Sequence, residues 1–330
     1  MERSRRRFLH RSGGVLALMA LARPGHGADN VRYPSRPVRV IVPYPAGTPL
    51  DVLMRIIGQR LSERLGQPVI VEDKPGASSN IGTELVARAP ADGYTLLAYG
   101  INFTVNPSLF SSVPYDAQKD FAPVAGLIRT PSVLIVRTDS PFKSVVDIVA
   151  RAREKPGALT YSSGGNGSMA HLCGELFKAG FGIDVLHTPY KGSPEVFQSV
   201  LSGQTDYSLP VFNSALTQIK AGAFRGLAVT SPQRMPQLAS VPTMHEVMGD
   251  KGFDLEAENG IVAPAGTPAA IIERLSSDVL AILRERDVAE PLVAQGFEIA
   301  AGTPGELSQR IAKDLAKYRE VVKKAHAHVD

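Results

Sequence analysis

The chain has 330 residues, of which 44% are hydrophobic and 21% charged, and its formal net charge at pH 7 is +4. These proportions are those of an ordinary globular protein. The single cysteine, Cys173, excludes an internal disulfide and any metal site built on several cysteines.

Residues 1–27 have the layout of a secretory signal peptide. A head rich in arginine precedes an apolar run at 13–22, and small residues follow at Gly25 and Gly27. The apolar run is about half the ~20 residues that a membrane-spanning helix needs. The segment from Ser4 to Leu9 resembles a twin-arginine export signal. We therefore expect cleavage near Gly27 and a mature protein in the periplasm, with a disordered basic tail as the alternative.

Cleavage would change the charge of the protein. Residues 1–27 contain six arginines and one glutamate, a net charge of +5, so their removal takes the net charge from +4 to −1. The mature chain then carries no overall positive charge to attract nucleic acid or anionic lipid. We predict that it binds no nucleic acid.

The mature chain opens with a unit of alternating strands and helices. β-branched residues, helical spacing of leucines and Gly/Pro breaks define this unit. It begins with a strand at 38–42, a loop at 43–49 and a helix at 50–65 that Gly66 ends. A strand at 69–71, a turn at 74–76, a helix at 82–89 and a strand at 94–97 follow.

A second unit repeats this order farther along the chain. It begins with a strand at 159–161, a glycine loop at 162–167 and a helix at 168–181 that Gly182 ends. A strand at 185–186, a turn at 190–192, a helix at 196–201 and a strand at 206–209 follow. Two units of matching order indicate an α/β protein with two domains of similar build. A mature length of roughly 300 residues also favours two domains. General similarity among α/β chains is the alternative explanation.

The rest of the chain predicts further strands at 133–136, 225–230 and 260–264, and amphipathic helices at 268–285 and 304–326. We expect the last part to return to the first domain, so that the chain crosses twice. Domain 1 would comprise residues 28–127 and 255–330, and domain 2 residues 128–254.

Both loops follow a strand and precede a helix. Ligands of open α/β sheets bind beyond the carboxyl ends of the strands. The unpaired N–H groups and the dipole of a helix N-terminus favour negative charge there. Two such loops facing each other would hold an acidic group without altering it.

The sequence resembles the substrate-binding proteins of the tripartite tricarboxylate transporter family, the Bug proteins, over essentially the whole mature chain. The segments that carry the resemblance are 33–37, 42–47, 65–69, 74–77, 80–83, 91–97, 106–109, 119–124, 164–171, 189–193, 227–231 and 263–268. The resemblance implies a periplasmic-binding-protein fold: two α/β domains joined by two hinge strands, with a ligand cleft between them. It also implies a small carboxylate ligand, held mainly by backbone amides, hydroxyls and water.

Carried over by position, the resemblance predicts ligand-binding residues in the two loops and beside them. These are Tyr44, Ala46, Gly47, Thr48, Asp51, Asn102, Ser163, Gly164, Asn166, Gly167, Ser168, His171 and Tyr190. Thr48 and Pro49 depart from the family, which usually has a second glycine after Gly47. Because proline has no N–H, we predict that this loop departs from the usual carboxylate pattern, with a harmless helix start as the alternative.

Several of these residues also have a structural interpretation. Ser168 is either a ligand contact or a helix N-cap. Asp51 lies in a first helical turn, where its charge suits the helix dipole. His171 is expected to hydrogen-bond behind the ligand, because Ser168 and His171 on one helix do not make a nucleophile and base. The loop at 164–167 lacks both a dinucleotide fingerprint and a phosphate-loop lysine.

The sequence thus predicts a binding protein without cofactor, metal or catalytic residues. We expect a monomer that delivers a dicarboxylate, tricarboxylate or aromatic acid to membrane permease subunits. The first alternative is a binding protein that signals to a sensor kinase. The second is an exported hydrolase.

Overall fold

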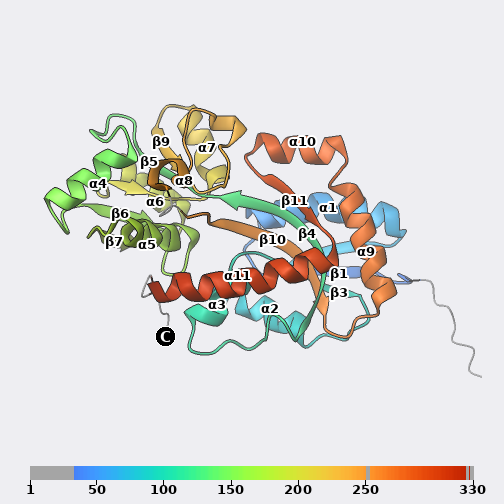
Figure 1. The fold of residues 1–330 in the computed structure, drawn as a ribbon. Coiled ribbons are helices and arrows are strands. Elements are labelled where there is room, and N and C mark those ends of the chain that lie inside the picture. Colours follow the sequence, from blue (N-terminus) through green and yellow to red (C-terminus); the bar gives the residue numbers. More distant parts are fainter. Residues whose placement is uncertain (1–32, 250–252, 325–326, 328–330) are drawn as a thin grey trace, which may run out of the picture. The chain divides into compact units, whose positions relative to one another are not determined.

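The fold is that of a computed structural model, which describes residues 33–249, 253–324 and 327. The predicted signal peptide at 1–27 lies outside the described residues. Two β-sheets with helices packed against them make up the described part of the chain (Figure 1). No helix within it is long and apolar enough to cross a membrane.

The first sheet has six strands. Their order is β11 (Glu298–Gly302), β4 (Phe121–Pro131), β10 (Glu256–Pro264), β3 (Thr95–Tyr99), β1 (Val38–Val42) and β2 (Val69–Asp73). Strand β1 is parallel to both β2 and β3, whereas β10 runs antiparallel to β3 and β4. Strand β11 pairs antiparallel with β4 at the edge.

The second sheet has five strands. Their order is β7 (Leu186–Pro189), β6 (Thr160–Ser163), β8 (Tyr207–Ser208), β5 (Val133–Arg137) and β9 (Phe224–Val229). Strand β6 is parallel to both β7 and β8. The order β2-β1-β3 in the first sheet therefore matches β7-β6-β8 in the second, which confirms that the two predicted units share a topology.

All six predicted helices are present, and their apolar spacing explains them; five further helices accompany them in the described part of the chain. The helices are α1 (Pro49–Leu65), α2 (Asn80–Ala87), α3 (Asn102–Leu109), α4 (Val145–Glu154), α5 (Met169–Phe181), α6 (Ser193–Leu201), α7 (Phe212–Lys220), α8 (Met244–Met248), α9 (Ala269–Ile282), α10 (Arg286–Ala294) and α11 (Pro304–Lys324). Short 3₁₀ turns, η1 (Ala77–Ser79) and η2 (Pro236–Leu238), complete the set. In α1, Leu53, Ile57 and Leu61 are buried, and Gly66 ends the helix in the left-handed conformation.

Some elements were not predicted. Strand β4 contains prolines and a glycine, which disfavour a strand, yet β10 and β11 hydrogen-bond it on both sides. Helices α3, α4, α7, α8 and α10 and strand β11 were also missed. Hydrogen bonds to β10 and β11 therefore stabilise the extended conformation of β4, which its local sequence does not favour.

The chain crosses between the sheets at two places that lie side by side. Strand β4 ends at Pro131 and β5 begins at Val133, while β10 begins next to Leu255. The Thr230 hydroxyl accepts the Ser132 N–H at 2.7 Å and donates to the Leu255 carbonyl at 2.6 Å. One buried side chain therefore ties both crossings together. The architecture is an α/β fold of two sheet-based domains joined by two strands.

Helix α11 contributes to the cores of both sheets. Leu307 and Ile311 in its first half pack with residues of α3 and β4. Tyr318 and Val322 in its second half pack in the same cluster as residues of the second sheet and α5. The last element thus returns to the first sheet, as expected from the sequence, and also reaches the second.

Candidate ligand-binding site

The first loop connects β1 to α1 at the carboxyl edge of its sheet. Gly47 has φ +80° and donates its N–H to Asp51 Oδ2 at 2.8 Å. The Thr48 hydroxyl donates to the Pro45 carbonyl at 2.9 Å. The Gly47 N–H and the Thr48 hydroxyl, both expected from the sequence to contact a ligand, therefore form hydrogen bonds within the loop region. The Ala46 N–H has no partner among the described residues.

Asp51 is 2% exposed and also pairs with Arg55 Nε at 2.8 Å. Burial alone would raise the pKa of Asp51, but the Gly47 N–H and Arg55 outweigh it and lower that pKa. The carboxylate therefore stays charged and holds the loop conformation by accepting the Gly47 N–H. This matches the structural interpretation of Asp51.

The second loop connects β6 to α5 in the same way. Gly165 and Gly167 adopt left-handed φ angles of 110° and 77°, and the Gly165 N–H donates to Ser163 Oγ at 3.2 Å. The Ser168 hydroxyl accepts the His171 N–H at 3.4 Å, which makes Ser168 the N-cap of α5. Among the described residues, the N–H groups of Gly164 and Asn166 have no partner, and both residues are exposed.

Helix α3 connects the two loop regions. Near its first residue, the Tyr44 hydroxyl donates to Asn102 Oδ1 at 2.9 Å. At its last residue, the Leu109 side chain lies so close to Gly167 that a Cβ there would overlap it. Seven residues separate Asn102 from Leu109, about 10 Å along a helix. The structure brings Tyr44 to Asn102 and Gly167 to α3, but within the described residues no hydrogen bond joins the two loops directly.

Amide side chains extend the polar region behind Tyr44. Asn106, which is fully buried, donates to the Ser78 carbonyl at 2.7 Å and to Asn80 Oδ1 at 2.8 Å. Ser78 lies in η1, where three successive non-glycine residues have positive φ. These residues were not assigned to the site, although 74–77 and 80–83 are among the segments that carry the resemblance. Nothing in the residue types themselves indicates left-handed backbone here.

Behind the second loop lie two histidines. His171 Nδ1 accepts the buried Gly167 N–H at 3.1 Å, and His187 Nε2 lies 2.7 Å from Ser163 Oγ. The two imidazole rings stack with centroids 4.4 Å apart. Burial lowers the pKa of both rings, and the neighbouring His171 helps to lower that of His187 to about 4. His187 was missed because it lies in β7, 24 residues from Ser163.

The Ser163–His187 pair does not have the setting of a nucleophile and base. Ser163 is fully buried, and its Oγ already accepts the Gly165 N–H. No group of three or more His, Cys, Asp or Glu residues in the described part of the chain could hold a metal ion. What the loops do offer is neutral hydrogen-bond donors.

The remaining predicted residue, Tyr190, follows β7. Its N–H donates to the Ser163 carbonyl at 2.8 Å, so its backbone joins the second loop. The neighbouring Lys191 is exposed.

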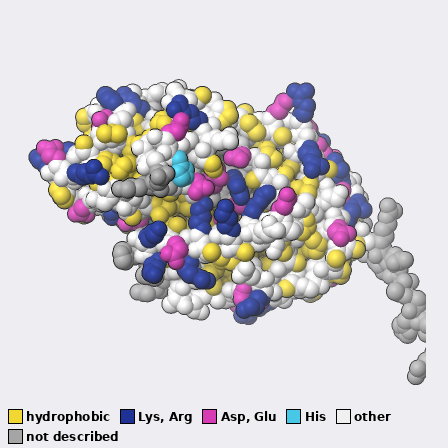
Figure 2. Space-filling model, viewed as in Figure 1, with side chains coloured by type: hydrophobic (Ala, Val, Ile, Leu, Met, Phe, Trp, Pro, Cys, Tyr) yellow, Lys and Arg dark blue, Asp and Glu magenta, His cyan; other side chains and the backbone are white. Residues whose placement is uncertain are grey.

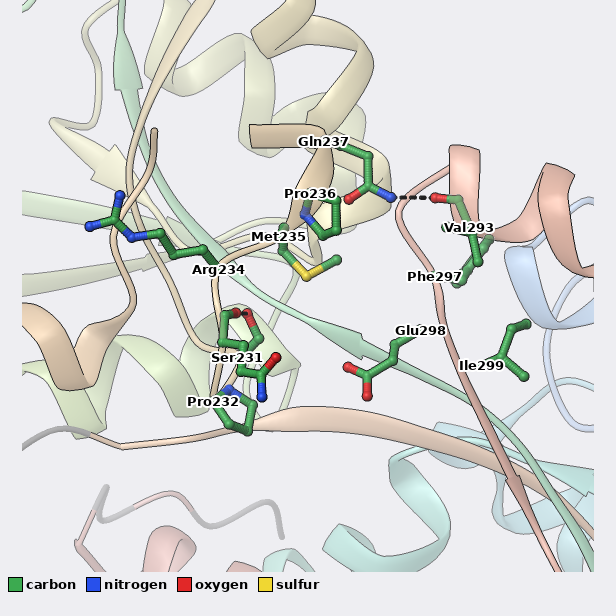
Figure 3. Close-up of a pocket in the computed structure, with 11 residues that line it drawn as sticks. Ser231, Pro232, Arg234, Met235, Pro236, Gln237, Val293, Phe297, Glu298 and Ile299 are labelled. Carbon is green, nitrogen blue, oxygen red and sulfur yellow. Dashed lines mark hydrogen bonds between the residues drawn. The ribbon is translucent and has the colours of Figure 1, made fainter. Parts of the chain in front are cut away.

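A separate cavity lies where the segment after β9 faces the segment between α10 and β11 (Figure 3). Its volume is about 370 Å³, and Gln237 Nε2 donates to the Val293 carbonyl across it. The carboxylate of Glu298 lines one wall, while Arg234 is paired with Glu246. Because Glu298 adds negative charge, this cavity suits an acid less well than the loops do.

Comparisons with known proteins identify the family. Residues 53–326 match the family model "Tripartite tricarboxylate transporter family receptor". The chain is 36% identical over 311 residues to the UPF0065 protein in the tcbD-tcbE intergenic region of Pseudomonas sp. (strain P51), which covers 93% of each chain. It is 33% identical over 323 residues to BugT of Bordetella pertussis, covering 97% of this chain and 98% of BugT.

Solved structures show the same fold. Rpa4515 of R. palustris with adipate has a TM-score of 0.80 and 33% identity, covering 90% of this chain and 100% of that one. The periplasmic binding protein BugD has a TM-score of 0.77 and 32% identity over 90% and 99% of the two chains. MatC of Rhodopseudomonas palustris with bound malate has a TM-score of 0.76 and 28% identity over 88% and 100%. The expected periplasmic-binding-protein fold is confirmed.

Proposed function

The chain belongs to the tripartite tricarboxylate transporter receptor family, and on that premise we propose that it captures a small organic carboxylate between its two domains and delivers it to a membrane permease. The family is one of solute-binding receptors rather than enzymes. Similar proteins of solved structure hold adipate and malate, both small carboxylates.

One observation carries the proposal. Within the described residues, the N–H groups of Ala46, Gly164 and Asn166 have no partner, and they lie at the carboxyl ends of equivalent strands in two matching sheets. Each lies just before a helix N-terminus, where the dipole and the backbone donors favour a negative group. Neutral donors of this kind bind an acid and leave its bonds unchanged.

The ligand-contacting set divides by role. We assign direct contact to Ala46, Gly164 and Asn166, and lining of the cleft to Tyr44, Thr48, Asn102 and Tyr190. Gly47, Asp51, Ser163, Gly167, Ser168 and His171 support the loop conformations through the hydrogen bonds described above.

The proposal includes where the protein works. Export through a twin-arginine signal at 1–27, cleavage near Gly27 and action as a periplasmic monomer fit delivery to a permease. Domain 1 would comprise 28–127 and 255–330, and domain 2 residues 128–254, with ligand contacts to both favouring a closed form.

A thermal-shift screen tests the binding step. The mature protein is heated with adipate, malate, citrate, phthalate and benzoate in turn, and a ligand that binds only the folded state raises Tm by an amount that grows with the logarithm of its concentration over Kd. We expect at least one of these acids to raise Tm, with isothermal titration calorimetry confirming a single site.

Dimethyl adipate serves as the matched control, because it keeps the carbon chain but lacks the charged carboxylates. It should neither raise Tm nor be hydrolysed. A panel in which no acid shifts Tm would refute carboxylate capture, and release of methanol from the ester would point to the hydrolase instead.

A further inference from the structure

We propose that the stacked imidazoles of His171 and His187 are positioning residues for the ligand, and that the second loop holds its binding conformation only while both are neutral. The inference rests on the proposed function and adds a pH-dependent release step to it. His187 lies outside both loops and contacts the second loop region through Ser163 and by stacking on His171.

The hydrogen bond to His171 fixes its protonation state. The Gly167 N–H is a donor, so Nδ1 of His171 must be an unprotonated acceptor, and the proton of the neutral ring lies on Nε2. Protonation would place two donors against each other at 3.1 Å. Gly167 is buried, so water does not readily replace the lost acceptor.

The hydrogen bond to His187 supports the other end of the loop. Ser163 Oγ accepts the Gly165 N–H and lies 2.7 Å from His187 Nε2. Ser163 is fully buried, so His187 contributes a contact that solvent cannot supply. Gly164 and Asn166, whose N–H groups we assign to ligand contact, lie between Ser163 and Gly167, the two residues that His187 and His171 hold in place.

The surroundings of the pair disfavour charge on either ring. The rings face each other at 4.4 Å, so two imidazolium ions would repel, and Tyr161 stacks on the other side of His187 at 4.8 Å. The charged groups that face them are Glu175 and Lys178 of α5, which act in opposite directions on His187. Glu175 is already engaged by the Tyr161 hydroxyl at 2.6 Å and by Lys178 at 2.9 Å.

Acidification should therefore weaken the loop. Burial lowers the pKa of both rings below the ordinary value of 6.5, for His187 to about 4. The pair stays neutral near pH 7 and gains protons as the pH falls from about 6.5 toward 4. The ligand would bind at neutral pH and be released in acid.

Matched variants distinguish a pH-dependent role of His171 and His187 from a purely structural one. In His171→Asn, the side-chain oxygen can take the place of Nδ1 as an acceptor for Gly167 but cannot be protonated. His187→Gln keeps a polar atom for Ser163 and removes the titrating ring. His171→Ala removes the acceptor, and His245→Gln removes an exposed histidine of α8 as a control.

Calorimetric titration of the mature protein with adipate at pH 7.5, 5.0 and 4.0 supplies the test. Because the carboxyl groups of adipate also take up protons over this range, each variant is compared with wild type at the same pH. Between pH 7.5 and 4.0, wild-type protein and His245→Gln should lose at least about twofold more affinity than His171→Asn and His187→Gln. His171→Asn should bind about tenfold more tightly than His171→Ala at pH 7.5. Equal pH dependence in wild type and both conservative variants would overturn the proposal.

The device can be tested even if adipate does not bind. In ¹⁵N-labelled protein, the Gly167 amide signal of the wild type should shift together with the His171 ring nitrogens as the pH falls, and in His171→Asn it should not. A Gly167 signal that ignores the titration of His171 would overturn the inference, whereas absence of ligand binding alone would count against the proposed function.

Discussion

Asp51 supports the conformation of the first loop from a buried position. Its carboxylate accepts the Gly47 N–H and pairs with Arg55, and only 2% of the residue is exposed. A glycine with φ +80° is held in place by a charge one helical turn away. The sequence suggested a dipole role for this residue, and the structure adds the specific donor that it satisfies.

We expect Asp51→Ala to destabilise the protein by about 1–3 kcal/mol, because the Gly47 N–H then loses the buried carboxylate that accepts it. Asp51→Asn should cost less, since its side-chain oxygen can still accept the Gly47 N–H. Urea unfolding followed by circular dichroism measures both. Asp139→Ala, which breaks the exposed pair with Arg137, is the control and should have a smaller effect. Equal losses for Asp51→Ala and Asp139→Ala would contradict the assignment.

Among the elements, α5 packs closely against β6 because residue 174 is a glycine and has no side chain. A Cβ at Gly174 would overlap the Tyr161 ring of β6, so only glycine lets the helix approach the sheet this closely. Tyr161 cannot easily yield, because its ring lies between His187 and Tyr207 and its hydroxyl donates to Glu175. The same approach sets His171 over His187.

Gly174→Ala should therefore destabilise the fold by about 1–3 kcal/mol through overpacking, despite the better helix propensity of alanine. Gly305→Ala in the first turn of α11 is the matched control, since no atom lies within 4 Å of its added Cβ. The control should be neutral or slightly stabilising. Thermal unfolding of both variants provides the measurement, and a Gly174→Ala protein as stable as wild type would show that α5 can move away from β6 at little cost.

At the scale of the whole molecule, charged residues gather where the strands cross. On the face shown in Figure 2, acidic and basic side chains are interspersed. Arg129 of β4 contacts Glu258 at 3.1 Å and lies 4.0 Å from Glu256, and Arg310 of α11 reaches Glu258 from the other side. Burial and the charge of Glu298 raise the pKa of Glu256 to about 7.

This raised pKa predicts how stability depends on pH. Between about pH 4.5 and 7 the folded protein holds a proton on Glu256 that the unfolded chain has released, so this group's contribution to stability falls as the pH rises. Glu256→Gln should be more stable than wild type at pH 7.5 by about 1–2 kcal/mol and nearly equal at pH 4.5. Urea unfolding at the two pH values measures the difference.

Glu320→Gln removes an exposed charge from α11 and is the control for overall charge. It should leave the pH dependence as in wild type. If Glu256→Gln gave the same stability increment at pH 4.5 and 7.5, Glu256 would not titrate in this range.

Local sequence was sufficient for the repeated units and for the positions of both loops. Apolar spacing and the terminal glycines Gly66 and Gly182 define α1 and α5, because these signals act within a few residues of the chain. The same local signals placed β1 and β6, and so identified the sheet edge at which we propose that the ligand binds.

Only the tertiary structure decided which donors remain free and what supports them. Gly47 and Gly167 resemble free donors in the sequence, but Asp51 and His171 accept their N–H groups. His187 reaches Ser163 from a neighbouring strand, and β4 is a strand because β10 and β11 pair with it. Hydrogen bonding and burial depend on distances between segments that lie far apart in the chain, and no local pattern contains those distances.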